Sequence, residues 1–137
     1  MTHTIAIRVY YEDTDAGGVV YYANYLKFAE RARTEFLREA GFENKSLRDD
    51  KGILLVVRHM EADYLKPARL DDLLRVETSV ESMKNTYMVM KQSIFRENDL
   101  LFSMDVKLAC IAAEGFKPVV FPVELKKGFE DHIANAR

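Results

Sequence analysis

Apolar and polar residues alternate with a period of two along most of the chain, the pattern of strands that bury one face. Near the N-terminus this alternation runs from Ile5 to Tyr11 and predicts a first strand. It returns in the second half of the chain over 53–65, 73–82, 87–96 and 102–110. Short polar turn segments separate the last three of these stretches. Consecutive strands joined by short turns pair antiparallel, so we predict one antiparallel sheet.

One long segment has the period of a helix instead. Asn24 is interpreted as its N-cap and Gly41 as the residue just past its C-terminus. The apolar positions between them form a wide stripe: Tyr25, Leu26, Phe28, Ala29, Ala32, Phe36, Leu37 and Ala40. Such a stripe predicts a helix that lies deeply against a sheet. A short helix is also predicted over 122–132, with Pro122 near its first turn.

The order of elements is a strand, a long helix, four strands and a short helix, which is typical of an α+β fold. One long helix covers only one face of such a sheet. The other face and the strands at the sheet edges then favour contact with a second subunit, so we predict a homo-oligomer.

Length and composition narrow the function classes. The chain has 137 residues, which fits one domain over 1–137, and a net charge of −2 gives no electrostatic reason to expect nucleic acid as a partner. The single cysteine, Cys110, excludes an internal disulfide and a cysteine-based zinc cluster. The three histidines, His3, His59 and His132, lack metal-ligand spacing. We therefore expect no metal and no cofactor.

No apolar run reaches the length of a membrane span, and acidic residues interrupt the N-terminal segment before a signal peptide could form. From this pattern we expect a cytoplasmic protein.

Candidate chemistry lies in the loop Asp13–Gly18 (DTDAGG), directly before the long helix. Gly17 and Gly18 lack a Cβ and allow the backbone to approach a ligand closely. A helix N-terminus offers unpaired N–H groups that can hold the oxygen of a polarised carbonyl. The carboxylate of Asp15 beside them would attack that carbonyl or activate a water. An acidic residue and glycines before a helix are more often a plain turn, so the loop composition leaves both interpretations open.

Residues 8–39, RVYYEDTDAGGVVYYANYLKFAERARTEFLRE, resemble the signature region of the hydroxybenzoyl-CoA thioesterase family. More narrowly, they resemble the acyl-CoA thioesterases encoded with the Tol–Pal cell-envelope system of Gram-negative bacteria. The resemblance continues through ADYLKPARLDD at 62–72 and covers nearly the whole chain. It implies a hot-dog fold, in which a curved antiparallel sheet of about five strands wraps a long helix. It also implies a dimer with a continuous sheet, commonly paired into a tetramer, with active sites at the dimer interface.

The resemblance assigns roles to four residues. Asp15 matches the catalytic aspartate and Gly18 the loop glycine of the motif. The backbone N–H of Tyr22 falls where the thioester carbonyl is polarised, and Tyr25 matches an aromatic position in the first helical turn. The Tol–Pal-associated members often have histidine at Tyr22, whereas the hydroxybenzoyl-specific members have tyrosine; either residue supplies the N–H.

The implied reaction is hydrolysis of acyl-CoA to a free acid and CoA, with Asp15 as nucleophile or general base. Acyl carrier protein is an alternative carrier of the acyl group. Two other functions stay open: a non-catalytic scaffold that binds acyl-CoA or acyl carrier protein, and a hydratase or dehydratase of the same fold. The latter needs a histidine paired with a carboxylate, and neither His3 nor His132 lies near the motif.

Other polar residues have simpler interpretations. Asp13 is expected to stabilise the turn, with a second catalytic acid as the alternative. Glu30 and Glu35 are expected to pair with arginines along the helix, and Cys110 to fill the core. His59 is interpreted as a structural or interface residue. Three methionines are expected to fill the core or to line an acyl tunnel: Met83, Met88 and Met90. Five basic residues are available for the CoA phosphates: Arg58, Lys66, Arg69, Lys84 and Lys91.

Overall fold

The computed structural model describes residues 2–135, with residues 132–135 described by their backbone alone, so the side chain of His132 lies outside the described part. The elements, in chain order, are β1 (His3–Arg8), the 3-10 turn η1 (Tyr11–Asp13), α1 (Tyr22–Glu39), α2 (Asn44–Lys51), β2 (Ile53–Tyr64), β3 (Leu73–Met83), β4 (Tyr87–Arg96), β5 (Asp99–Ala112) and α3 (Val123–Asn135).

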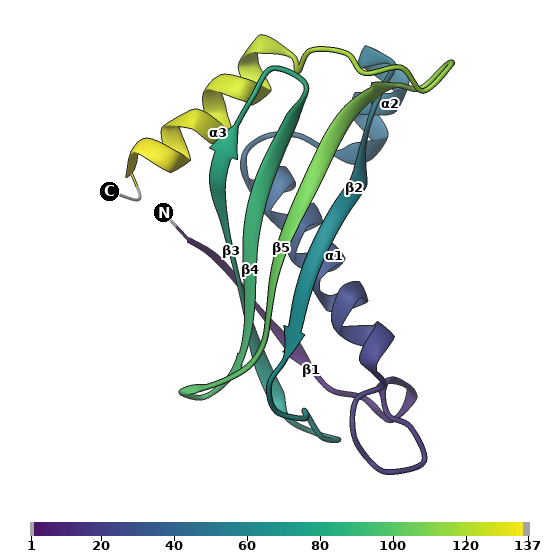
Figure 1. Cartoon of the computed structure of the whole chain (residues 1–137), viewed down its shortest axis with the longest axis vertical. Coiled ribbons are helices and arrows are strands. Elements are labelled where there is room, and N and C mark those ends of the chain that lie inside the picture. The colour runs from purple at the N-terminus through teal and green to yellow at the C-terminus, as the bar shows by residue number, and fades with distance from the viewer. Residues whose placement is uncertain (1, 136–137) are drawn as a thin grey trace.

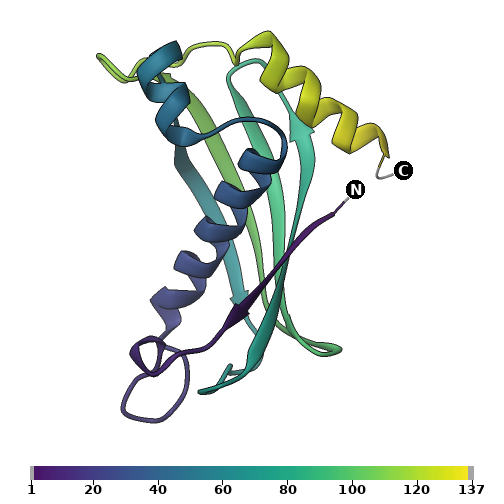
Figure 2. The ribbon, with the colours of Figure 1, turned by 180° about the vertical axis from the view of Figure 1, so that it is seen from behind.

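The five strands form one sheet in the order β1-β3-β4-β5-β2, and every neighbouring pair is antiparallel. The sheet is curved (Figure 1), and α1 lies across one of its faces (Figure 2). This confirms the predicted α+β class and the hot-dog arrangement that the resemblance implied. β1 and β2 form the two edges of the sheet, so β2 has a partner strand in this chain on one side only.

The core lies between α1 and the inner face of the sheet. The predicted inward positions of β3 are all buried, namely Leu74, Val76, Thr78 and Val80. On α1 the predicted stripe is buried at Tyr25, Phe28, Ala29, Ala32, Phe36 and Leu37. The period of two in the strands and the helical period in α1 therefore converge on one core, as predicted.

The predicted ends of the first two elements are wrong by a few residues. β1 ends at Arg8, and Tyr11 lies in η1 with 83% of its surface exposed. The reason is local, because the carboxylate of Asp13 accepts the N–H of Tyr10 at 2.9 Å and turns the chain away from the sheet. α1 begins at Tyr22, so Asn24 is not its N-cap. The Asn24 side chain instead donates to the Asp13 carbonyl at 2.8 Å.

The helix α2 is absent from the sequence prediction. Of its eight residues, NKSLRDDK, only Leu47 is buried, and a single apolar position produces no period. Gly52, with φ of +68°, ends α2 in the left-handed conformation that favours glycine.

The predicted C-terminal helix is confirmed as α3, which begins directly after Pro122. Leu125 and Phe129 anchor it to the core, and the Phe129 ring meets that of Phe36 edge-on at 5.3 Å. None of the described helices combines the length and the apolar character needed to cross a membrane.

Candidate active site

Backbone hydrogen bonds hold the loop between β1 and α1 in place. The N–H of Asp15 donates to the Val19 carbonyl at 2.9 Å, and the N–H of Val20 donates to the Ala68 carbonyl at 2.8 Å. Gly18 has φ of +79°, a conformation that side chains resist, and this lets the chain reverse between Asp15 and Val19. The predicted loop glycine is thus required by the turn that presents Asp15.

The carboxylate of Asp15 is exposed and is held at one oxygen. Its Oδ1 accepts the N–H of Gly17 at 2.8 Å. A Cβ at position 17 would lie 3.3 Å from that oxygen, so glycine leaves the carboxylate room. Within the described residues, Oδ2 has no hydrogen-bond partner. A carboxylate that is oriented by one oxygen and open at the other is suited to act as a nucleophile or a base.

The N-terminus of α1 has no side-chain cap. Tyr21 occupies the N-cap position without a side-chain hydrogen bond there, and the first turn has no acidic residue. The N–H of Asn24 donates back to the Tyr21 carbonyl at 2.9 Å. Across residues 2–135, the amides of Tyr22 and Ala23 donate to no acceptor. The positive end of this 18-residue helix therefore offers two donors that can stabilise a developing oxyanion.

Tyr25 is buried in the core of its own chain. Its hydroxyl accepts the N–H of Ala68 at 2.9 Å, and its ring stacks on Phe102 at 5.4 Å between centroids. Tyr25 therefore ties the first turn of α1 to the segment between β2 and β3. Its contact with a substrate stays a prediction.

Tyr64, at the end of β2, was not singled out from the sequence. Its hydroxyl donates to the carbonyl of Tyr22 at 3.0 Å, and the Tyr22 residue is exposed. The ring of Tyr64 meets that of Tyr25 edge-on, with 5.3 Å between the ring centroids. Burial raises the pKa of the Tyr64 phenol, and the neighbouring phenols of Tyr22 and Tyr25 raise it further. Tyr64 is therefore a protonated donor at neutral pH and helps to fix the start of α1. The sequence contains one indication that Tyr64 belongs near the site, because Tyr64 lies in the segment ADYLKPARLDD that carries the family resemblance.

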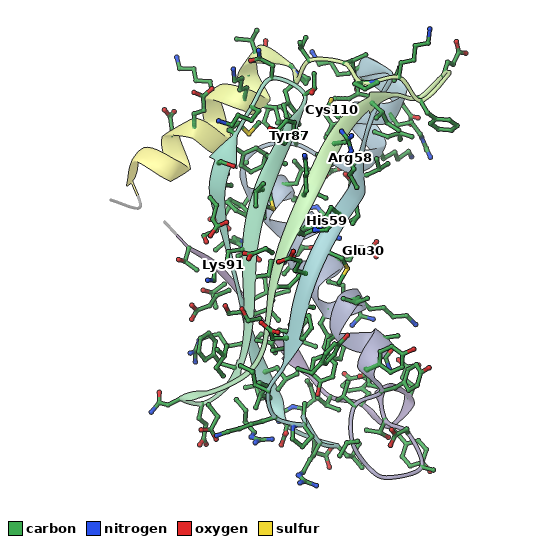
Figure 3. The ribbon with its side chains drawn as sticks, in the orientation of Figure 1. Glu30, Arg58, His59, Tyr87, Lys91 and Cys110 are labelled. Atoms are coloured by element: carbon green, nitrogen blue, oxygen red, sulfur yellow. The ribbon has the colours of Figure 1, made fainter. Side chains whose placement is uncertain are left out.

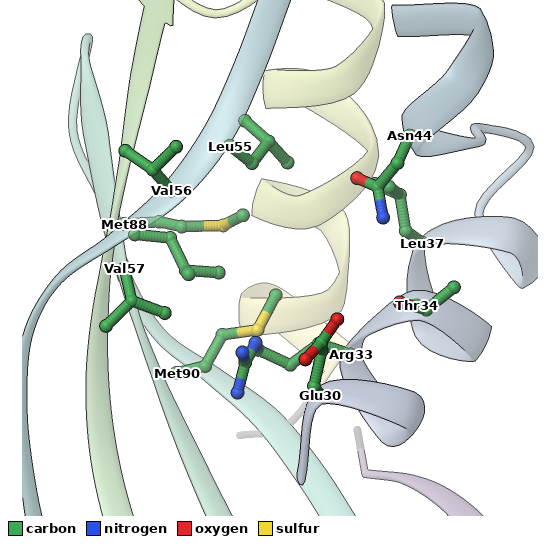
Figure 4. A pocket seen from close by; sticks show the side chains of 11 residues that line it. Glu30, Arg33, Thr34, Leu37, Asn44, Leu55, Val56, Val57, Met88 and Met90 are labelled. Atoms are coloured by element: carbon green, nitrogen blue, oxygen red, sulfur yellow. The ribbon is translucent and has the colours of Figure 1, made fainter. Parts of the chain in front are cut away.

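A cavity of about 310 Å³ lies between the second half of α1, the start of α2 and β2 (Figure 4). Its lining residues are Glu30, Arg33, Thr34, Leu37, Asn44, Leu55, Val56, Val57, Met88, Met90 and Leu108. Met88 and Met90 are buried, which confirms their core role, and they also line this cavity. Their contact with an acyl chain stays a prediction. Asp15 of the same chain does not line this cavity.

Comparison with known proteins decides the family. The profile of the thioesterase superfamily matches residues 17–103, more than half of the chain. The chain belongs to the thioesterase superfamily. It is 47% identical over 123 residues to the acyl-CoA thioesterase YbgC of Haemophilus influenzae, covering 90% of each chain. A probable thioesterase from Bartonella henselae has 39% identity and a TM-score of 0.85, covering 89% of this chain and all of that one. The DHNA-CoA thioesterase of Staphylococcus aureus has 25% identity and a TM-score of 0.91, covering 98% and 93%.

The superfamily match begins two residues after Asp15, so it contains Gly18, Tyr22 and Tyr25 but not the predicted catalytic carboxylate. The proposed role of Asp15 therefore rests on the loop geometry and on the sequence motif around this residue.

The structure confirms three further predictions about individual polar residues. Asp13 is buried and binds the N–H of Tyr10, which confirms its turn-stabilising role. Cys110 is buried in the core, as predicted, and burial raises the pKa of its thiol to about 11. Glu35 pairs with Arg38 along α1.

The basic residues that were candidates for CoA phosphates are spread over the molecule. Arg58 lies on β2 beside the exposed His59, and Lys91 lies on β4 (Figure 3). Lys66 is already paired with Asp99 at 3.3 Å. Arg69 differs, because its backbone forms a β-bridge with Val19. Of these, Arg69 is the cation that the fold places against the Asp15 loop.

Proposed function

We propose that the protein hydrolyses acyl-CoA thioesters, with Asp15 as the catalytic carboxylate. The observation that carries this proposal is the pairing of two features in one loop: a carboxylate with a free oxygen, and the uncapped N-terminus of an 18-residue helix. The names of the relatives support the substrate class, since the relative from Haemophilus influenzae is named an acyl-CoA thioesterase. Such a substrate also supports a cytoplasmic location. The link to the Tol–Pal system stays a prediction from the resemblance.

In the proposed reaction, the amides of Tyr22 and Ala23 bind the thioester carbonyl oxygen and stabilise the negative charge that develops on it. Asp15 then takes one of two routes. As a general base it removes a proton from water, the hydroxide adds to the carbonyl carbon, and the C–S bond breaks. As a nucleophile it forms a mixed anhydride that water hydrolyses. In both routes CoA leaves as the thiolate and is then protonated.

The test is the release of free CoA, followed with a thiol reagent, from short, long and aromatic acyl-CoA substrates. We expect release with at least one class, and the chain-length profile then defines the acyl group. Hydrolysis of acyl carrier protein thioesters alone would reassign the carrier. Tight acyl-CoA binding without thiol release from any substrate would contradict the enzyme and support the scaffold. Hydration of an enoyl-CoA would favour the hydratase.

We further propose that the active unit is an oligomer joined through β2. This edge strand has 12 residues, and outside β5 its backbone groups have no strand partner in the described chain. Long unpaired edges favour pairing with another strand. β2 and α1 run in opposite directions along the molecule (Figure 1). A two-fold axis through the middle of β2 would therefore bring the partner's α1 N-terminus to the half of β2 that lines the cavity. Asp15 of the partner subunit would then act on a substrate bound in this cavity.

Arg58 offers a test of this interface. It is skipped in the register between β2 and β5, which passes from Val57 opposite Leu108 to His59 opposite Lys107. Proline is tolerated at such bulges, so we expect Arg58→Pro to fold but to block pairing along the outer edge. Light scattering should show the wild type as a dimer or tetramer and the variant at the monomer mass of 15.8 kDa, with CoA release lost.

The matched control is Arg58→Ala, which removes the side chain and keeps the N–H. It should retain the oligomer and the activity. A monomeric wild type, or an Arg58→Pro oligomer of unchanged mass, would contradict pairing through β2.

A further inference from the structure

Arg33 brings a positive charge into the wall of the cavity between α1, α2 and β2. Its Nη1 donates to Oε1 of Gln92 at 3.0 Å. Gln92 is completely buried, and its Nε2 donates to the Ala29 carbonyl at 2.8 Å and to Thr78 Oγ1 at 3.0 Å. Since both donors of the amide are engaged, its oxygen is directed at Arg33. The sheet thus holds the guanidinium in one position.

The Arg33 guanidinium keeps donors available for a ligand. A guanidinium has five N–H groups, and one of them is used in the bond to Gln92. Within the described residues, no carboxylate lies within ion-pair distance of Arg33, although Glu30 lies one turn earlier on the same helix. Burial lowers the pKa of Arg33, and the Glu30 carboxylate partly offsets this. A half-buried cation without a direct anionic partner is costly unless a ligand or a polar group completes its contacts.

The rest of the cavity is suited to an acyl chain. Its other walls are largely apolar, and the sheet contributes Leu55 and Val57 from β2 and Met88 and Met90 from β4. Figure 4 shows Arg33 extending from α1 toward Met90, with Glu30 beside it. One water molecule occupies about 30 Å³ in the liquid, and a non-hydrogen atom of an acyl chain takes a similar volume. The cavity of about 310 Å³ therefore holds about ten such atoms. An acyl group of medium length fits this space.

From these contacts we infer that the cavity binds the acyl group and that Arg33 selects acyl chains carrying a neutral distal oxygen, such as a hydroxyl. The inference rests on the proposed acyl-CoA hydrolysis and adds the class of acyl group. Arg33 and Glu30 together carry no net charge, so a neutral ligand leaves the site balanced. A hydroxyl can accept from Arg33 and donate to Glu30, whereas a second carboxylate would meet Glu30 with the same charge.

The probes are thioethers of CoA, which bind but cannot be hydrolysed: S-hexyl-CoA, S-(6-hydroxyhexyl)-CoA and S-(5-carboxypentyl)-CoA. Calorimetry with the wild-type protein should show the hydroxyl compound binding most tightly. Arg33→Met keeps the length and loses the donors, so its affinity for the hydroxyl compound should fall by about 10- to 100-fold, the range of a hydrogen bond to a charged group. Its affinity for S-hexyl-CoA should not fall, because the apolar compound uses no donor of Arg33, and this retained binding also shows that the variant is folded.

Arg31→Met is the matched control, since Arg31 is exposed on the same helix and does not line the cavity. It should retain the preference for the hydroxyl compound. Equal binding of the hexyl and hydroxyhexyl compounds by the wild type, or an unchanged preference in Arg33→Met, would overturn the inference. Tightest binding of the carboxyl compound would overturn the neutral-ligand assignment. The thioethers report binding alone, so a missing hydroxyl preference would contradict only the role of Arg33. The proposed hydrolysis would be contradicted by a different result, namely no CoA release from the matching thioesters.

Discussion

Replacing Asp15 with asparagine is expected to lower the rate of CoA release by about 10²- to 10⁴-fold, the usual contribution of a positioned acid or base. Asparagine retains a side-chain oxygen that can accept the N–H of Gly17, so the turn should keep its shape. It lacks the negative charge and basicity that either proposed route requires. Because Asp15 is exposed, the substitution removes no core contact, and thermal unfolding should be close to that of the wild type.

The loop provides a matched control in Asp13→Asn, two residues earlier. Asp13 is buried and its Oδ2 accepts the N–H of Tyr10, so replacing the charged acceptor should reduce stability by about 1 kcal/mol while CoA release persists. The two substitutions should therefore have different effects: Asp15→Asn should lower turnover, and Asp13→Asn should lower stability. Near-normal hydrolysis by Asp15→Asn would rule out its catalytic role.

Truncation of Phe28 to alanine is expected to have the largest effect on folding, about 3–5 kcal/mol. Phe28 is completely buried on the inner face of α1, and its ring lies 6.4 Å from that of Tyr25. Removing it leaves a cavity where the helix meets the sheet, and the packed surroundings can relax only in part. The free energy of unfolding would be measured in urea at one fixed protein concentration, since association also affects stability.

Phe116→Ala is the matched control. It removes the same side chain from a position with 66% exposure, at the turn after β5. Its effect should lie within about 0.5 kcal/mol. Similar losses for the two variants would mean that α1 is not packed as deeply as the structure shows.

The site could be predicted from the sequence only in part. Asp15 and Gly18 were singled out because a loop motif is local in sequence, and Tyr22 was assigned through the family resemblance. The structure places Asp15 and Gly18 in the loop directly before α1, which begins at Tyr22, and their catalytic roles stay a proposal. Tyr64 was missed because its hydrogen bond to Tyr22 joins residues 42 positions apart. Arg33 was missed for the same reason, since its partner Gln92 lies on the opposite layer.

The sequence by itself determined which residues face the core. Side-chain direction repeats every two residues in a strand and every 3.6 in a helix, so the buried faces of α1, β3, β4 and β5 follow from spacing alone. The tertiary structure decided what spacing does not contain. α2 formed with only Leu47 buried, and the sheet order put β2 at an edge. It also placed Arg33 in a cavity wall. These outcomes depend on contacts between segments distant in the chain, and such contacts form only when the whole sheet closes around α1.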